Sequence, residues 1–132
     1  MPRKPSPRPT DVELAILRVL WSRGPSTVRE VHEALVEQSG REDTGYSTTL
    51  KMMQVMHDKA LLARDESVRP QVYRASQGEE QTQTEMVRDL MDKVFGGSAR
   101  KLVLRAVESE NVSADELAQI RKLLKQMEGG KA

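Results

Sequence analysis

Tyr46-Ser-Thr-Thr-Leu-Lys-Met-Met-Gln-Val-Met56 is the stretch that decides the fold of this chain. Apolar residues recur in it at helical spacing, which predicts a helix that opens with Ser47 as its N-cap and runs to about Ala60. Its inward stripe is expected to consist of Leu50, Met53, Met56 or His57, and Ala60. The opposite stripe stays available for contact and consists of Thr48, Lys51, Met52 and Val55.

Two shorter helices are predicted before this one, because two capping boxes precede it. Thr10-Asp-Val-Glu13 begins the first helix, and Gly24-Pro25 ends it. Glu13 and Arg18 are expected on a different face from its apolar residues, which are Leu14, Leu17, Leu20 and Trp21. Thr27-Val-Arg-Glu30 begins the second helix, and Gly40 stops it.

A β-hairpin is predicted after the third helix. Residues 61–64 and 71–75 suit two short strands, and the polar, proline-containing segment 65–70 joins them. Three helices followed by a hairpin within about 65 residues are the element order of a winged helix-turn-helix domain, whose third helix lies in the major groove of DNA. The predicted fold class is therefore mainly α, with a winged helix-turn-helix domain and a small β-hairpin wing at the N-terminal end.

The C-terminal half is predicted to form three short amphipathic helices that dimerise the chain. Residues 76–84 have almost no apolar side chains and are either a linker or the solvated first turns of the next helix. Short helices of this kind cannot bury their apolar faces alone, so self-association is the simplest expectation. The expected dimer interface consists of Met86, Leu90, Val94, Leu102, Leu117, Ile120 and Leu124. The predicted domains are a flexible basic arm (1–9), the winged helix-turn-helix domain (10–76) and a helical dimerisation domain (77–130).

The expected DNA-binding surface centres on the helix that begins at Tyr46. Hydroxyl groups and free backbone N–H groups at a helix N-terminus suit phosphate oxygens, and apolar side chains can contact thymine methyl groups. The candidate residues are Thr27, Tyr46, Ser47, Thr48, Thr49, Lys51, Met52, Val55, Arg69 and Arg74. The same pattern also fits the ordinary exposed side of a surface helix, and solvation of a hairpin explains the arginines nearly as well. The N-terminal Arg3, Lys4 and Arg8 form either a DNA-binding arm or a disordered tail.

Composition argues against catalysis. The 132 residues include no cysteine, which removes disulfides, thiol catalysis and cysteine-based zinc sites. The only histidines are His32 and His57, and the zinc-protease pattern that His32-Glu33 opens is broken by Val36. We therefore expect no catalytic residues, no cofactor and no metal. No apolar run reaches the length of a membrane span and no signal peptide is recognisable, so we expect a cytoplasmic protein without membrane contact.

Taken together, these segments resemble the penicillinase-repressor (BlaI/MecI) family of bacterial winged-helix regulators over nearly the whole chain. The residues that carry the resemblance are Glu13-Leu-Ala-Ile-Leu-Arg-Val-Leu-Trp21, Gly24-Pro25, Thr27-Val-Arg-Glu-Val31, Tyr46 to Met56, Lys59-Ala-Leu-Leu62, Arg64-Asp-Glu-Ser67, Val72-Tyr-Arg74, Asp92-Lys-Val-Phe-Gly-Gly-Ser98 and Leu102-Val-Leu104. Position 60, usually glycine in the family, is Ala60 here.

The resemblance implies a homodimer that binds a palindromic operator and represses a neighbouring operon, often one for β-lactam resistance. It also implies release by proteolysis of the repressor, triggered by a membrane sensor protease. The family's cleavage point, Asn-Phe in its well-known members, falls on Arg105-Ala106 and so differs in this chain. Related copper-responsive repressors use C-terminal cysteines, which this chain lacks.

A second function, from a different class, fits the same fold. A winged-helix domain can serve as a protein-interaction adaptor that never touches DNA. Binding to DNA weakens steeply with salt because counterions are released from the phosphates, so the salt dependence of affinity separates the two hypotheses.

Overall fold

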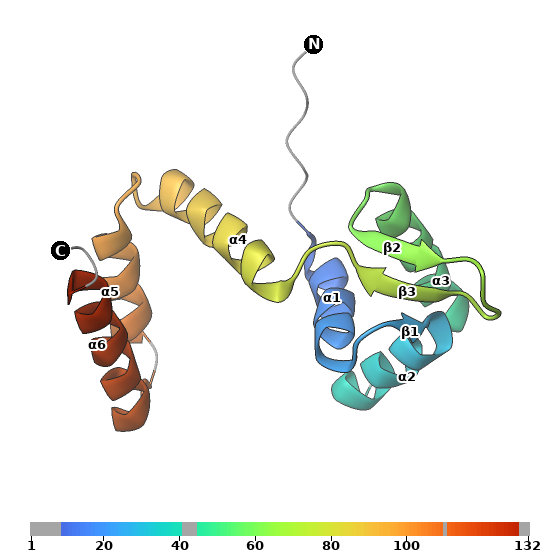
Figure 1. The fold of residues 1–132 in the computed structure, drawn as a ribbon, viewed down its shortest axis with the longest axis horizontal. Helices are drawn as coiled ribbons and strands as arrows, with labels where there is room; N and C mark the ends of the chain where they lie inside the picture. The colour runs from blue at the N-terminus through green and yellow to red at the C-terminus, as the bar shows by residue number, and fades with distance from the viewer. Residues whose placement is uncertain (1–8, 41–44, 110, 130–132) are drawn as a thin grey trace, which may run out of the picture. The chain divides into compact units, whose positions relative to one another are not determined.

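The computed structural model describes residues 9–40, 45–109 and 111–129. Arg3, Lys4 and Arg8 of the predicted basic arm lie outside the described residues. In chain order the elements are α1 (Asp11–Arg23), β1 (Ser26–Thr27), α2 (Val28–Ser39), α3 (Tyr46–Asp58), β2 (Leu62–Asp65), β3 (Val72–Ala75), α4 (Glu79–Val94), α5 (Ala99–Ser109) and α6 (Ala114–Gly129) (Figure 1). They form two compact units, Met1–Met86 and Val87–Ala132, so the division between the units falls inside α4.

The first two helices begin and end as the sequence predicts. The hydroxyl oxygens of Thr10 and Thr27 accept hydrogen bonds from the backbone N–H groups of Glu13 and Glu30, and both capping boxes are complete. Gly40 ends α2 in the left-handed conformation at φ 69°, which a residue without a Cβ adopts freely. These local signals therefore fix the limits of α1 and α2.

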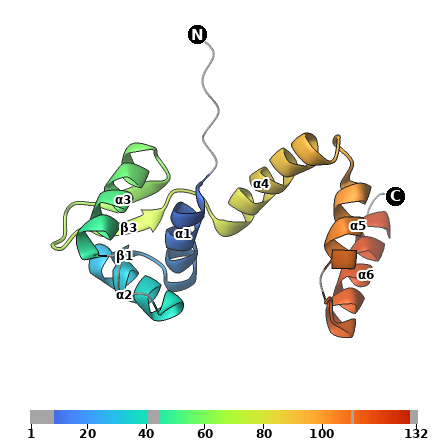
Figure 2. The same cartoon turned by 180° about the vertical axis from the view of Figure 1, so that it is seen from behind.

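The wing belongs to a three-stranded antiparallel sheet with the order β1-β3-β2. The hairpin of β2 and β3 confirms the predicted wing, and its register pairs Arg64 with Tyr73. Strand β1 was not predicted. It has only two residues, Ser26 and Thr27, and pairs with β3 just before α2 begins. Helices α1, α2 and α3 pack around this sheet, which gives the winged helix-turn-helix arrangement (Figures 1 and 2).

The core of the first unit lies between the three helices and the sheet. Its buried apolar residues are Ile16, Leu17, Val19, Leu20, Val28, Val31, Ala34, Met53, Met56, Leu62 and Tyr73. The expectation that Glu13 lies away from the apolar face is wrong, because Glu13 is buried at 3% exposure. A buried carboxylate needs compensation, and Lys59 Nζ lies 2.7 Å from Glu13 Oε2. The partner is 46 residues away in the sequence, so no local pattern indicates it.

The two ends of α3 differ from the prediction. The N-cap is Gly45 and not Ser47, and no side chain caps the helix. At the other end Leu61 N donates to Met56 O, and Ala60 N donates to His57 O, which is the hydrogen-bond pattern of a Schellman motif. Ala60 therefore lies beyond the helix, exposed and at φ 68°, and the prediction that it joins the inward stripe is wrong.

The polar segment 76–84 is partly a connection and partly the beginning of α4. Gly78 precedes α4, so residues 79–84 are the first turns of that helix, and all of them except Thr82 are exposed. Trp21 Nε1 donates to Gln77 O at 2.9 Å, and Thr82 Oγ1 donates to Gln77 Oε1 at 3.3 Å. Thr82 is only 7% exposed. The start of α4 is therefore fastened to α1 within the first unit.

The C-terminal unit has little interior of its own. Helices α5 and α6 lie side by side (Figures 1 and 2), yet neither contains a buried residue. Large apolar side chains stay exposed on the helices of this half of the chain: Val87, Leu90, Val94, Val103, Leu104, Leu123, Leu124 and Met127. Exposed apolar surface of this extent is typical of a surface that another chain covers.

Candidate nucleic-acid interface

The outer face of α3 is the best candidate for a contact surface. Ser47, Thr48 and Lys51 are exposed, and Val55 is 39% exposed. Gln54 is also exposed, three residues after Lys51 and beside Val55 in the sequence, and our sequence analysis missed it. Spacings of three and four residues place these side chains on one stripe of the helix. The stripe offers hydroxyl groups, one cation, one amide and one apolar group to a partner.

The start of α3 suits an anion. Gly45 provides no side chain to accept from the first backbone N–H groups, and the Ser47 hydroxyl is not used as a cap. These N–H groups carry the positive end of the helix dipole, which favours a negatively charged oxygen. The hydroxyl groups of Ser47 and Thr48 lie in the same first turn. This end of the helix therefore has the donors that a phosphate group requires.

Thr49 does not belong to this face. It is only 2% exposed, and its hydroxyl lies 2.9 Å from His32 Nδ1 on α2. Its hydroxyl contacts another side chain inside the protein, so the prediction that Thr49 contacts DNA is wrong. Met52 is half-buried and packs against the core, so it is less available than predicted. Thr27 is half-buried and uses its hydroxyl to cap α2.

Tyr46 joins α3 to α2 through its ring. Its exposed fraction is 38%, and its ring meets that of His32 edge-on, with centroids 5.9 Å apart and planes at 87°. The guanidinium carbon of Arg29 lies 4.8 Å from the Tyr46 ring centroid, within the range of a cation–π contact. The sequence analysis named neither Arg29 nor His32 for this site, since both lie 14 or more residues from Tyr46 along the chain.

The wing presents two exposed arginines, Arg69 and Arg74. Arg69 Nη1 donates to Glu66 O at 2.8 Å and to Val68 O at 3.2 Å, which keeps the side chain near the loop backbone. Arg64 is paired instead, with Nη2 2.7 Å from Glu66 Oε2, so its charge is compensated within the wing. The Ser67 hydroxyl and backbone N–H both donate to Asp65 Oδ1. These hydrogen bonds hold the turn and lower the pKa of Asp65.

The predicted dimer residues fall into two groups. Leu90, Val94 and Leu124 are exposed, with fractions of 46%, 63% and 53%. The others are half-buried: Met86, Leu102, Leu117 and Ile120. The predicted cleavage residues, Arg105 and Ala106, are exposed within helix α5, where Arg105 pairs with Glu108 at 2.9 Å.

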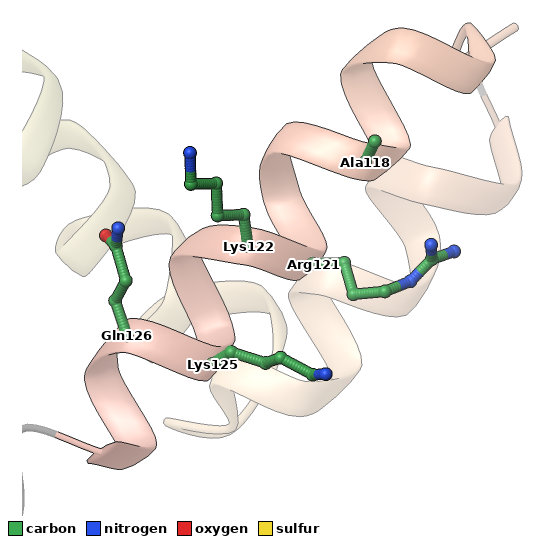
Figure 3. A pocket seen from close by; sticks show the side chains of 5 residues that line it. All are labelled: Ala118, Arg121, Lys122, Lys125 and Gln126. Atoms are coloured by element: carbon green, nitrogen blue, oxygen red, sulfur yellow. The ribbon is translucent and has the colours of Figure 1, made fainter.

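Within the described ranges, no cluster of metal-ligating side chains is present. No group of three or more His, Cys, Asp or Glu residues could hold a metal ion in that part of the chain. One surface depression is lined by His32, Glu33, Val36 and Glu37 of α2. Another is lined by Ala118, Arg121, Lys122, Lys125 and Gln126 of α6 (Figure 3). The described residues that line each depression come from one helix, and those of the α6 depression include three cations and no carboxylate. Among the described helices, none is long and apolar enough to cross a membrane.

Comparison with known proteins agrees with this architecture. The model of the penicillinase repressor family matches residues 9–126. The chain is also similar to the proteins named transcriptional regulator BlaI in Mycobacterium tuberculosis strains CDC 1551 / Oshkosh and ATCC 25618 / H37Rv. Each is 32% identical over 121 residues, which cover 91% of this chain and 85% of the relative. The chain therefore belongs to the penicillinase repressor family and is a non-enzymatic transcriptional regulator.

Proposed function

We propose that this chain represses transcription by binding a palindromic operator as a homodimer, with α3 in the major groove. The observation that carries the proposal is the exposed stripe of α3, from Ser47 to Val55, in a winged-helix domain. A recognition helix must keep one face free of its own protein, and this stripe meets that requirement. The names of the two relatives, transcriptional regulator BlaI, support a role in transcription.

Each part of the first unit has a separate task in this proposal. The first turn of α3 binds a backbone phosphate through its N–H groups and the hydroxyls of Ser47 and Thr48. Lys51 adds charge one turn further, and Val55 contacts a thymine methyl group. Arg69 and Arg74 of the wing lie along the adjacent sugar-phosphate backbone.

The C-terminal helices form the interface with the second copy of the chain in this proposal. The exposed Leu90, Val94 and Leu124 would be covered in a homodimer, which removes their apolar surface from water. When two winged-helix domains are linked and one binds its half-site, the other is held near the second half-site at a high effective concentration. The linked pair therefore binds more tightly than separate domains do. Half-sites about 10 base pairs apart would place both α3 helices on one side of the duplex.

Release by proteolysis is the remaining part of the proposal. Cleavage at Arg105-Ala106 would separate the winged-helix domain from α6 and the last turn of α5, and so weaken dimerisation. The bond lies within a helix, so α5 must open locally before a protease can bind the segment in an extended form. We propose that a sensor-controlled protease makes this cut and that the regulated operon serves β-lactam resistance or a similar stress response.

The experiment is the selection of bound duplexes from a random-sequence library, followed by titration of the selected duplex at several salt concentrations. We expect an inverted repeat, an affinity that falls steeply with salt, and a salt slope that is smaller by about two in Lys51→Ala, about one for each copy in the dimer. The variant should retain the thermal stability of the parent because Lys51 is exposed. Failure to enrich any sequence, or an affinity that salt does not change, would favour the protein-interaction adaptor.

A further inference from the structure

The N-terminal ends of α2 and α3 meet at a cation–π contact. Arg29 is the second residue of α2 and Tyr46 is the first residue of α3, and 4.8 Å separates the Arg29 guanidinium carbon from the Tyr46 ring centroid. Arg29 is exposed, and no carboxylate of the described residues forms an ion pair with it. The guanidinium is therefore positioned by an aromatic face while its charge stays available to another anion.

The Tyr46 ring also has a contact with α2. The rings of His32 and Tyr46 form a T-shaped pair, and His32 Nδ1 lies 2.9 Å from the hydroxyl oxygen of Thr49. Thr49 is buried at 2% exposure. A continuous series of contacts thus runs from the buried side of α3 through His32 and Tyr46 to the exposed guanidinium.

This arrangement gives Arg29 properties that a freely moving surface arginine lacks. A guanidinium binds phosphate through parallel N–H donors, and its geometry matters for that contact. The cation–π contact restricts the long side chain before binding, so less rotamer freedom is lost when a phosphate is bound. No carboxylate of the described residues pairs with the N–H donors of Arg29, so an anion can approach them.

We infer that Arg29 contacts a backbone phosphate of the operator and that Tyr46 is the positioning residue that holds it there. The inference rests on the proposed function and deepens it, because it adds a residue from α2 to the DNA-binding surface. When the start of α3 enters the groove, the start of α2 lies beside it and faces the strand that borders the groove. Arg29 contributes affinity and not base specificity, since a phosphate carries no sequence information.

The test uses the full chain and the selected duplex, with Arg29→Ala, Arg29→Lys, Tyr46→Leu and the double variant Arg29→Ala/Tyr46→Leu. Arg29→Ala is expected to weaken binding at least ten-fold and to lower the salt slope by about two, about one for each copy in the dimer. Arg29→Lys is expected to recover the slope but only part of the affinity, because an ammonium group cannot form the bidentate contact. In the Tyr46→Leu background, the loss caused by Arg29→Ala should be smaller, since the positioned geometry is already absent.

Arg18→Ala is the matched control, because it removes an exposed positive charge from α1 and should leave affinity and slope unchanged. If the parent binds its duplex and Arg29→Ala has the parent's salt slope, the inference is overturned and the proposed function stands. A fall in melting temperature without a change in slope would mean that the pair only fastens α2 to α3, which also overturns it. If the parent binds no duplex, both the inference and the proposed function fail.

Discussion

Lys59 and Glu13 form an ion pair that joins the end of α3 to the start of α1, with Nζ 2.7 Å from Oε2. The Glu13 side chain is only 4% exposed, whereas that of Lys59 is 31% exposed. The other carboxylate oxygen, Oε1, accepts from Thr10 N at 2.9 Å and so completes the capping box of α1. One carboxylate therefore caps the first helix and anchors the helix that carries the candidate DNA-binding face.

The ion pair predicts how stability depends on pH. Burial raises the pKa of Glu13. Hydrogen bonds from Lys59 and Thr10 and the charge of Lys59 together lower it by more, so the pKa of Glu13 lies below the ordinary 4.5. A carboxyl with a lowered pKa stabilises the fold above its unfolded pKa, and this contribution disappears as the pH falls through the folded pKa. Glu13→Gln should thus reduce the unfolding free energy by about 2 kcal/mol at pH 7 and flatten its decline below pH about 4.5.

Urea unfolding followed by circular dichroism at several pH values measures both effects. Glu37→Gln is the control, since Glu37 is exposed on α2. An unchanged acid profile in Glu13→Gln would show that the pair contributes nothing to the fold.

Ala60→Gly should stabilise the protein. Ala60 occupies the left-handed position of the Schellman motif at φ 68°, where a Cβ is unfavourable and glycine is not. The expected gain is about 1 kcal/mol in unfolding free energy. Ala15→Gly, inside α1, is the matched control and should lose a similar amount because glycine disfavours a helix interior. A loss in both variants would contradict the assigned role of position 60.

Thr48 and Thr49 are adjacent, but replacement by valine should affect different properties: DNA binding at position 48 and stability at position 49. Thr49→Val removes the hydroxyl that meets His32 and should cost about 1 kcal/mol of stability. Thr48→Val changes an exposed side chain, so stability should stay within about 0.5 kcal/mol while operator binding weakens. Thermal unfolding and fluorescence anisotropy measure the two effects. Equal stability of the two variants would contradict the stabilising role assigned to the contact between Thr49 and His32.

Leu124→Glu should produce monomers without unfolding the winged-helix domain. Leu124 is 53% exposed on α6, so a charge is tolerated in the single chain but not in an apolar interface between two copies. Light scattering should report half the mass of the parent, and operator affinity should fall because the half-sites are no longer bound by linked domains. Gln119→Glu places the same charge at another exposed position of α6 and should remain dimeric. A dimeric Leu124→Glu would show that the interface lies elsewhere.

The sequence predicts best what is decided locally. The capping boxes at Thr10 and Thr27 and the glycine stop at Gly40 each depend on a few neighbouring residues, and all appear in the structure. The hairpin wing is likewise a local pairing, joined by one polar loop. Strand β1 escaped prediction because two residues are too few to show an alternating pattern.

Tertiary partners account for the remaining differences. Glu13 looks like a surface residue until Lys59 is known to neutralise it, and Thr49 looks like part of a hydroxyl-rich helix start until His32 is placed beside it. Ser47 was the expected N-cap, but the N-cap is Gly45, two residues earlier. The pairing of Arg29 with Tyr46 depends on the way α2 crosses α3, which no spacing within either helix reveals.

The most direct test of the account is a map of DNA cuts made from a single position on α3. The chain has no cysteine, so Lys51→Cys can carry one iron-chelate cleavage reagent per copy, with Arg18→Cys as the control. We predict that position 51 produces two clusters of cuts in the selected operator, about 10 base pairs apart and symmetric about its centre, and that position 18 does not. A single cluster, or no cuts from position 51 in a duplex that the protein binds, would contradict the claim that two copies of α3 lie in successive major grooves.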